Sequence, residues 1–333
     1  MGLFTCATNI RQLPEDWDAI SSDHPFLSRS FLQHLEVVNP CGQQYYYSIG
    51  PQGISLFVTY QHRLNILTYG IGHLALNLTV VGIPCSVSSP GFLIKNDTLE
   101  DFKNELGRIQ GGVLILNSGF HDLAPHCVCG QTLPTCILKT NGLNFRTYLD
   151  SMRSHYRYKI MKSMQRFAEV QITKLDDNSC FSPDFYRLYE QVFDRSDFKL
   201  EKLPISFFQQ SKSQLTLFEK DNEPLAFCQT KLSERNYYFL FGGIDYNNNH
   251  RFDTYFNMLI HIVKSGFEHR VETIDLGQTA EWVKMRLGCT LDPRYLFARH
   301  SNPLIHFGIK KGIHLLGYRN QPTKPHVFKG RRK

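Results

Sequence analysis

The sequence predicts an α+β protein in which antiparallel strands and helices are arranged in two successive domains. Its 333 residues are 42% apolar and 20% charged, the balance of a globular protein with an ample core. Segments rich in aromatic and β-branched residues, typical of strands, are interspersed with segments whose apolar residues recur at helical spacing. This length favours two domains, which we place at 1–145 and 146–318, followed by a basic tail at 319–333.

The first domain is predicted to be mostly β, with short helices. Helical spacing or a serine cap indicates helices at 13–20, 28–36 and 98–109, and the last of these carries Phe102, Leu106 and Ile109 on one face after a Thr98 cap. Aromatic and β-branched runs predict strands at 43–50, 54–62 and 64–70, and the apolar run at 111–119 predicts a buried strand.

The second domain opens with a segment that is strongly basic. Between Asp150 and Glu169 the chain has no acidic residue, and its cations alternate with tyrosine, isoleucine and methionine. The pattern predicts an amphipathic basic helix whose arginines and lysines could bind phosphate groups and whose tyrosines could stack on bases. A basic face that only meets solvent remains the alternative.

The remaining elements follow in a legible order. A strand at 170–175 precedes helices at 182–196, with Ser182 as cap and Pro183 in the first turn, and at 204–214. Three strands joined by tight turns fill 215–244. The loop "DYNNNHR" leads into a long helix from Phe252, then a strand at 271–276, a helix at 280–288 that ends at Gly288, and a strand at 294–300. The tail is expected to be partly disordered.

Charge and cysteine usage narrow the class of protein. The net charge of +7 favours anionic ligands such as phosphates, CoA, nucleotides or tRNA. No stretch of about 18 apolar residues is present, so no membrane span is expected. Nine scattered cysteines indicate free thiols and a cytoplasmic location. The cluster of His121, His126, Cys127, Cys129 and Cys136 matches no standard zinc spacing, so no metal site is predicted.

The order of elements is similar to the GNAT acyltransferase fold. The segment "FGGIDYNNNHRFDTYFNMLIHIVKSGFEHRVETIDLGQTAEWVKMRLGC" resembles the C-terminal half of the GNAT-related family that includes FemAB-like proteins and BioF2-like acyltransferase domains. The likeness extends over about 146–300 and is weaker over 1–145. The resemblance implies tandem GNAT-like domains, each a mixed, mostly antiparallel sheet flanked by helices, with a degenerate N-terminal one.

This resemblance implies an N-acyltransferase without a permanently bound cofactor. The donor would be a cosubstrate, an acyl-CoA or an acyl carrier protein, and the acceptor an amine of a small metabolite or cell-envelope precursor. The glycine-rich loop of acetyl-CoA-dependent GNATs is absent, which leaves open an aminoacyl-tRNA-dependent, FemX-like transferase. A non-catalytic protein that binds RNA or a nucleotide is the third alternative. Oligomeric state is not predicted.

The candidate donor-binding residues lie in the loop before the long helix. Asn248, Asn249, His250 and Arg251 stand where the phosphate loop of a GNAT would lie, since a helix N-terminus and nearby cations favour an anion. A plain solvated turn is the alternative for this loop.

Four residues are candidates for catalysis. Asp245 could act as base or anchor for the amine, and Tyr255 could reach substrate through its hydroxyl. Gln278 and Lys284 could bind a carboxylate, a phosphate or the developing oxyanion. The competing interpretation is that Asp245 caps its loop, Tyr255 lies at the surface, Gln278 caps a helix and Lys284 is solvated. Further candidates for substrate binding are Tyr156, Arg157, Tyr246, Thr279 and Trp282.

Overall fold

The computed structural model describes residues 4–50, 53–69, 72–96, 98–120, 122–123, 127–319 and 322–330. The chain forms two compact units that are not continuous in sequence. The first comprises 1–133, 197–204 and 293–320, and the second comprises 134–196, 205–292 and 321–333. The sequence-based ranges differ from these units, because they keep 197–204 and 293–318 with the second domain.

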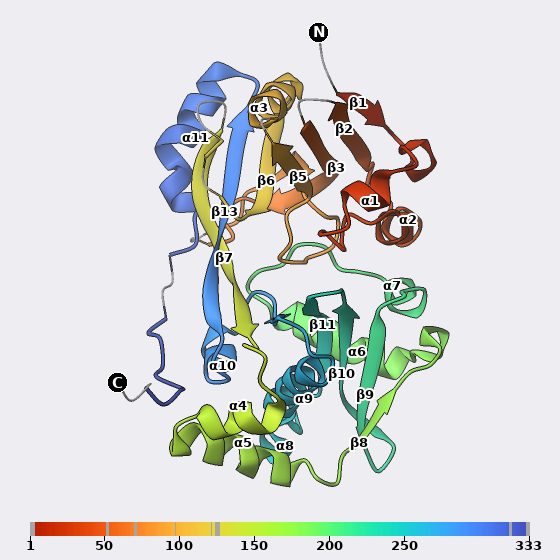
Figure 1. The fold of residues 1–333 in the computed structure, drawn as a ribbon. Coiled ribbons are helices and arrows are strands. Elements are labelled where there is room, and N and C mark those ends of the chain that lie inside the picture. The colour runs from red at the N-terminus through yellow and green to blue at the C-terminus, as the bar shows by residue number, and fades with distance from the viewer. Residues whose placement is uncertain are drawn as a thin grey trace. The chain divides into compact units, whose positions relative to one another are not determined.

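The first unit is built on a mixed, mostly antiparallel sheet (Figure 1). Its strand order is β1-β2-β3-β4-β6-β13, with β5 on the same edge of β3 as β4. All of these pairs are antiparallel except β4–β6. The strands are β1 (Thr5–Ala7), β2 (Gln44–Gly50), β3 (Gly53–Asn65), β4 (Ala75–Val81), β5 (Phe92–Asn96), β6 (Gly112–Ser118) and β13 (Thr290–His300), and the chain enters the second unit within β7 (Val128–Lys139).

The helices of the first unit are η1 (Ile10–Gln12), α1 (Trp17–Ile20), α2 (Arg29–Val38), α3 (Leu99–Arg108) and α11 (Pro303–Leu316). Phe102 and Leu106 are buried as the helical pattern predicts. The Arg299 guanidinium donates to the carbonyls of Leu106, Gly107 and Ile109 and so satisfies the C-terminal end of α3.

The segment 197–204 is held in the first unit by a buried carboxylate. Tyr60 Oη donates to Glu201 Oε1 at 2.8 Å, and Ser86 Oγ donates to Glu201 Oε2 at 3.1 Å. Burial and the nearby carboxylate raise the pKa of the Tyr60 phenol well above its usual value, so the phenol keeps the proton that it donates.

The second unit contains a six-stranded run in the order β7-β12-β11-β10-β9-β8, antiparallel except at β11–β12. The fold-class prediction, α+β with mixed, mostly antiparallel sheets flanked by helices, is confirmed in both units. Its further strands are β8 (Gln171–Lys174), β9 (Gln214–Lys220), β10 (Glu223–Leu232), β11 (Asn236–Ile244) and β12 (Thr273–Asp275), and its helices are α4 (Phe145–Ser151), α5 (Ser154–Arg166), η2 (Asn178–Cys180), α6 (Pro183–Arg195), α7 (Ile205–Gln209), α8 (Asn249–Phe252), α9 (Thr254–Glu268) and α10 (Glu281–Met285).

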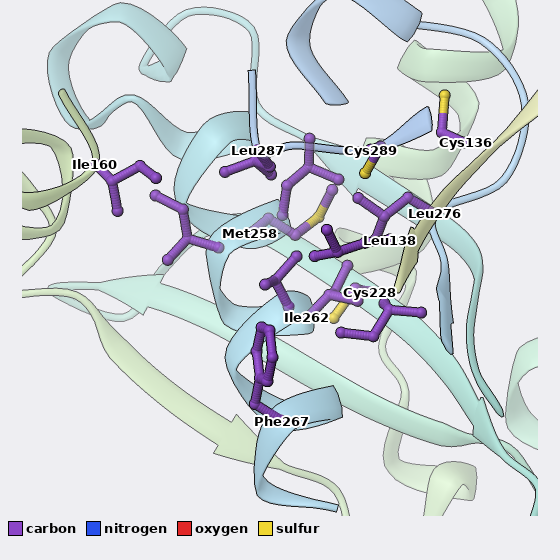
Figure 2. Packing of buried hydrophobic residues seen from close by; sticks show 14 of the residues in the cluster. Cys136, Leu138, Ile160, Cys228, Met258, Ile262, Phe267, Leu276, Leu287 and Cys289 are labelled. Atoms are coloured by element: carbon purple, nitrogen blue, oxygen red, sulfur yellow. The ribbon is translucent and has the colours of Figure 1, made fainter. Parts of the chain in front are cut away.

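Two apolar layers cover this sheet. On one face α9 packs on β10 through residues such as Met258 and Ile262, and Ile160 of α5 joins the same cluster (Figure 2). On the other face α6 and α7 pack through an aromatic layer that includes Phe208 and Phe227, whose ring centroids are 5.6 Å apart. Gly243 of β11 is required there, because a Cβ would lie 2.6 Å from the backbone of α6.

Several elements differ from the sequence-based prediction. The expected strand at 64–70 lies mostly in a turn, because β3 runs on to Asn65. The expected long helix from Phe252 is divided into α8 and α9 by Asp253, whose φ of 50° no regular helix accommodates. The expected basic helix is present as the single helix α5, and a separate helix, α4, precedes it. β4, β5, β7 and α11 were not predicted.

The C-terminal segment packs on the second unit. Val327 is buried, its carbonyl accepts the Arg153 N–H at 2.9 Å, and Lys329 N–H donates to Ser151. Phe328 fills the space beside Gly288, where a Cβ would lie 2.3 Å from the ring. This part of the basic tail is therefore packed rather than disordered.

The His261→Gln substitution should make the protein less sensitive to acid. Burial, together with the positive charges of Lys174 and Lys264, lowers the pKa of His261 to about 4. Between about pH 6.5 and 4 the unfolded histidine binds protons that the folded one does not, so stability falls as the pH drops through this window. We expect the variant to lose roughly 2 kcal/mol less than the wild type over that range in urea unfolding. Parallel acid dependence of the two proteins would contradict this assignment.

Candidate active site

The candidate site lies where β11 and β12 part. Their parallel pairing starts at Asn236–Thr273 and ends at Tyr238–Asp275, whereas β11 continues to Ile244. The N–H of Asp245 donates to a carbonyl of β10. Since N–H groups alternate between the two edges of a strand, those of Ile244 and Gly242 are directed to the edge that β12 has left.

The turn after β12, residues 276–280, has an unusual backbone. Gly277, Thr279 and Ala280 have φ of 72°, 63° and 49°. Left-handed backbone at a non-glycine residue costs free energy and persists only where other contacts hold it. The Asp275 carboxylate supplies such contacts, because its Oδ1 accepts the Thr135 hydroxyl and the Gly277 N–H, each at 2.7 Å.

Lys284 holds the same turn from α10. Its side chain is only 1% exposed, and its Nζ donates to the carbonyls of Gln278 at 2.6 Å and Gly277 at 3.2 Å. Burial lowers its pKa, and neighbouring groups that include Asp275 and Glu281 oppose that shift. The structure thus brings Gln278 and Lys284 together through a backbone carbonyl. The alternative of a solvated lysine is wrong.

The other candidates of this segment are more accessible. Gln278 and Thr279 are half-buried, and Trp282 projects its ring to solvent from α10. The N-cap position of α10 is occupied by Ala280 rather than by Gln278, and the backbone of Ala280 is left-handed. The alternative in which Gln278 caps the helix therefore does not describe this turn.

The loop after β11 is organised by Asp245. Its Oδ1 accepts the Asn247 N–H at 3.0 Å, and its Oδ2 accepts the Asn248 side chain at 2.7 Å. Asn249 Oδ1 accepts the Tyr255 N–H at 3.0 Å, so it occupies a donor at the start of α9. The side chains of Asp245, Asn248 and Asn249 are therefore engaged in shaping the loop.

The remaining loop candidates lie at the surface or near α6. His250 and Arg251 are exposed on α8, and the Arg251 guanidinium lies 4.8 Å from the centre of the Phe252 ring. The Tyr246 ring lies 3.9 Å from the Arg195 guanidinium. Arg195 was not a candidate, since it is fifty positions away in sequence and only the fold brings it to this loop.

Tyr255 lies in the first turn of α9, near Cys136, Tyr246 and Glu281. Burial, and then these three neighbours, raise the pKa of its phenol, so the hydroxyl is protonated at neutral pH. Tyr255 is half-buried, which corrects the alternative of a surface role. The proximity of Cys136 and Glu281 to Tyr255 was not indicated by the sequence, because it depends on the fold, including the pairing of β7 with β12.

The substrate-binding candidates on α5 have different surroundings. Tyr156 packs partly against the core of the second unit, and Arg157 lies 3.5 Å from Asp150 in a solvent-accessible ion pair. The face with Tyr158, Met161 and Lys162 is exposed. Arg166 pairs with Asp253 at 2.9 Å and so ties α5 to the start of α9.

The structure describes the cysteine- and histidine-rich segment only in part. Cys127, Cys129 and Cys136 are free thiols, and burial raises the pKa of Cys136 to about 11. His121 and His126 lie outside the described residues. Among the residues that the structure describes, no group of three His, Cys, Asp or Glu side chains could hold a metal ion, and no helix is long and apolar enough to cross a bilayer.

Comparisons with known proteins define the class of fold. Residues 151–285 match the model of the acetyltransferase (GNAT) domain family. The structure is similar to FemX, at 12% sequence identity and a TM-score of 0.57, over 89% of this chain and 98% of FemX. The structure is also similar to L-PGS from Bacillus licheniformis, at 12% sequence identity and a TM-score of 0.52, over 90% of this chain and 95% of L-PGS. A conserved protein of unknown function from Bacteroides thetaiotaomicron VPI-5482 is similar at 11% sequence identity and a TM-score of 0.53, over 85% of this chain and 96% of that protein. No curated protein matches the chain in sequence.

The candidate site therefore lies within a GNAT-type domain. The family match includes the whole of β11, α9, β12 and α10, and the FemX likeness extends the same fold to nearly the full chain. The resemblance to the GNAT domain is confirmed by the family match, and the resemblance to the fold of FemX by the structural comparison.

The Lys284→Met substitution should loosen the turn at 276–280. Methionine fills similar space but cannot donate, so the Gln278 carbonyl loses its buried donor, at a cost of about 1–3 kcal/mol in unfolding free energy. Amide hydrogen exchange at 277–280 should be faster in the variant.

Lys264→Met is the matched control, because Lys264 is exposed on α9 and its Nζ lies 3.8 Å from a carboxylate oxygen of Glu268 at the surface. It should change stability by less than about 0.5 kcal/mol. Equal stability and exchange in the two variants would show that Lys284 does not hold the turn.

Proposed function

We propose that this protein is an acyltransferase that moves an acyl group from a thioester to the amine of a small metabolite or cell-envelope precursor. The observation that carries the proposal is the parting of β11 and β12 inside the GNAT-type domain, which leaves strand N–H groups unpaired by β12. Such donors can hold an acyl carbonyl and stabilise the oxyanion that forms when an amine attacks it. The acyl donor enters as a cosubstrate.

The chemistry assigns a distinct role to Tyr255. When the amine nitrogen bonds to the acyl carbon, the carbon–sulfur bond breaks and a thiolate leaves. Burial keeps this phenol protonated at neutral pH, so it can pass a proton to that thiolate as it takes up the proton that the nitrogen loses.

Other candidates act on the positions of these groups. Lys284 and Asp275 fix the turn at 276–280. Asp245 acts as an anchor of the loop rather than as the base, because both its oxygens accept hydrogen bonds within that loop. Gln278, Thr279, Trp282 and Tyr246 remain candidates for contact with the acceptor.

Tyr255→Phe tests the assigned proton donor. The variant should lower kcat about 10²-fold, the usual contribution of a positioned acid, with KM and melting temperature nearly unchanged. Tyr158→Phe on the exposed face of α5 is the matched control and should keep wild-type kcat. Unchanged kcat in Tyr255→Phe would remove this residue from the mechanism.

A second candidate is an aminoacyl-tRNA-dependent transferase on the same fold. It is favoured by the start of α9, where α8 and the Asn249 side chain replace the glycine-rich loop of acetyl-CoA-dependent relatives. It is also favoured by α5, which exposes Lys159 and Lys162 beside the Tyr158 ring. A basic face with an accessible ring suits an RNA donor.

The donor can be distinguished by adding RNase to an assay with the purified protein, acyl-CoAs, acyl carriers, charged tRNA and a panel of amines. Thioester-dependent turnover that survives RNase supports the first candidate. RNase-sensitive turnover, weakened by Lys159→Gln with Lys162→Gln, supports the second, since each lost phosphate contact weakens RNA binding. RNA binding without turnover from any donor would contradict both and favour a non-catalytic protein.

A further inference from the structure

The outward face of α11 is apolar where a surface helix is ordinarily polar. Leu304 is 84% exposed, Phe307 is 60% exposed and Ile305 is 50% exposed. Ile309 and Ile313 are more covered, so the helix rests on the first unit through another side. Single exposed apolar residues are common, but a group of them on one short element marks an interaction surface.

Helical spacing places these side chains together. Leu304, Phe307 and Lys311 follow the i, i+3, i+7 pattern, so the two apolar side chains and the lysine share one helix face. Asn302 caps the helix by accepting the N–H of Leu304 at 2.9 Å, and Pro303 occupies its first turn. The apolar residues are thus presented at the start of a well-defined 14-residue helix rather than in a loop.

The charged side chains of α11 itself have one sign. Lys310 and Lys311 are exposed in the next turn, and Lys311 Nζ lies 5.5 Å from the centre of the Phe307 ring. No acidic residue follows Asp292 in the sequence. Apolar side chains flanked by lysines, with no acid nearby on the helix, complement a surface that has an apolar interior and anionic groups at its boundary with water.

We propose that α11 docks the protein on an anionic lipid bilayer, with Leu304, Ile305 and Phe307 among the acyl chains and Lys310 and Lys311 among the headgroups. The apolar side chains project outward from a helix rather than line a groove, which suits a deformable bilayer. The helix would lie in the interface, consistent with its being too short to span. Binding would be reversible, because the apolar surface is small and needs the added attraction of anionic lipid. The inference is independent of the proposed acyl transfer.

Flotation of the full chain with vesicles tests the proposal. The wild type should bind phosphatidylcholine vesicles that contain phosphatidylglycerol and not those of phosphatidylcholine alone, and salt should weaken the binding. Leu304→Ser with Phe307→Ser should weaken partitioning about tenfold or more. Lys310→Gln and Lys311→Gln should each weaken it about fivefold.

Val37→Ser is the matched control, because Val37 is 66% exposed on α2 of the same unit. It should bind anionic vesicles as the wild type does. Failure of the wild type to bind either vesicle would overturn the proposal. So would equal binding by the Leu304/Phe307 variant and the control. The wild type could instead fail to bind vesicles and form a dimer in light scattering. If the Leu304/Phe307 variant alone were monomeric, the face would be assigned to a second copy of the chain.

Discussion

The hydrogen bonds of the Asp275 carboxylate are the constraint on which the candidate site depends. At the end of β12 its Oδ1 accepts both the Thr135 hydroxyl of β7 and the Gly277 N–H. The first bond ties β12 to one neighbour, and the second turns the chain away from β11. The Lys284 ammonium completes the turn from the far side. These contacts help to offset the cost of left-handed backbone at Thr279 and Ala280.

Burial also shifts the pKa values of the titratable groups in the candidate site. Low polarity around the start of α9 keeps the Tyr255 phenol protonated, and it raises the pKa of the Cys136 thiol to about 11. Burial lowers the pKa of Lys284, and its amine donates there to two backbone carbonyls. One buried region therefore holds a protonated phenol and a hydrogen-bonded amine within the same unit.

The sequence predicted the second unit better than the first, for physical reasons. Strong periodicity and turn residues marked β9, β10, β11 and α10, so their order could be derived locally. The break at Asp253 depends on one residue's backbone angle, and the burial of Lys284 depends on strand pairing across the fold. The segment of β7 contains glycine and proline, which are uncommon in strands, so its sequence did not indicate one. The Asn302–Pro303 start of α11 is a helix-start signal that is present in the sequence itself.

The interleaving of the two units has a consequence for how the protein is made. β13 completes the first unit by pairing with β6, yet it lies some 170 positions later in the chain. During synthesis the edge of β6 that β13 will cover therefore stays unpaired with it until β13 has left the ribosome. The first unit therefore cannot be completed until most of the second unit has been synthesised, and fragments cut at the middle of the chain would leave it incomplete.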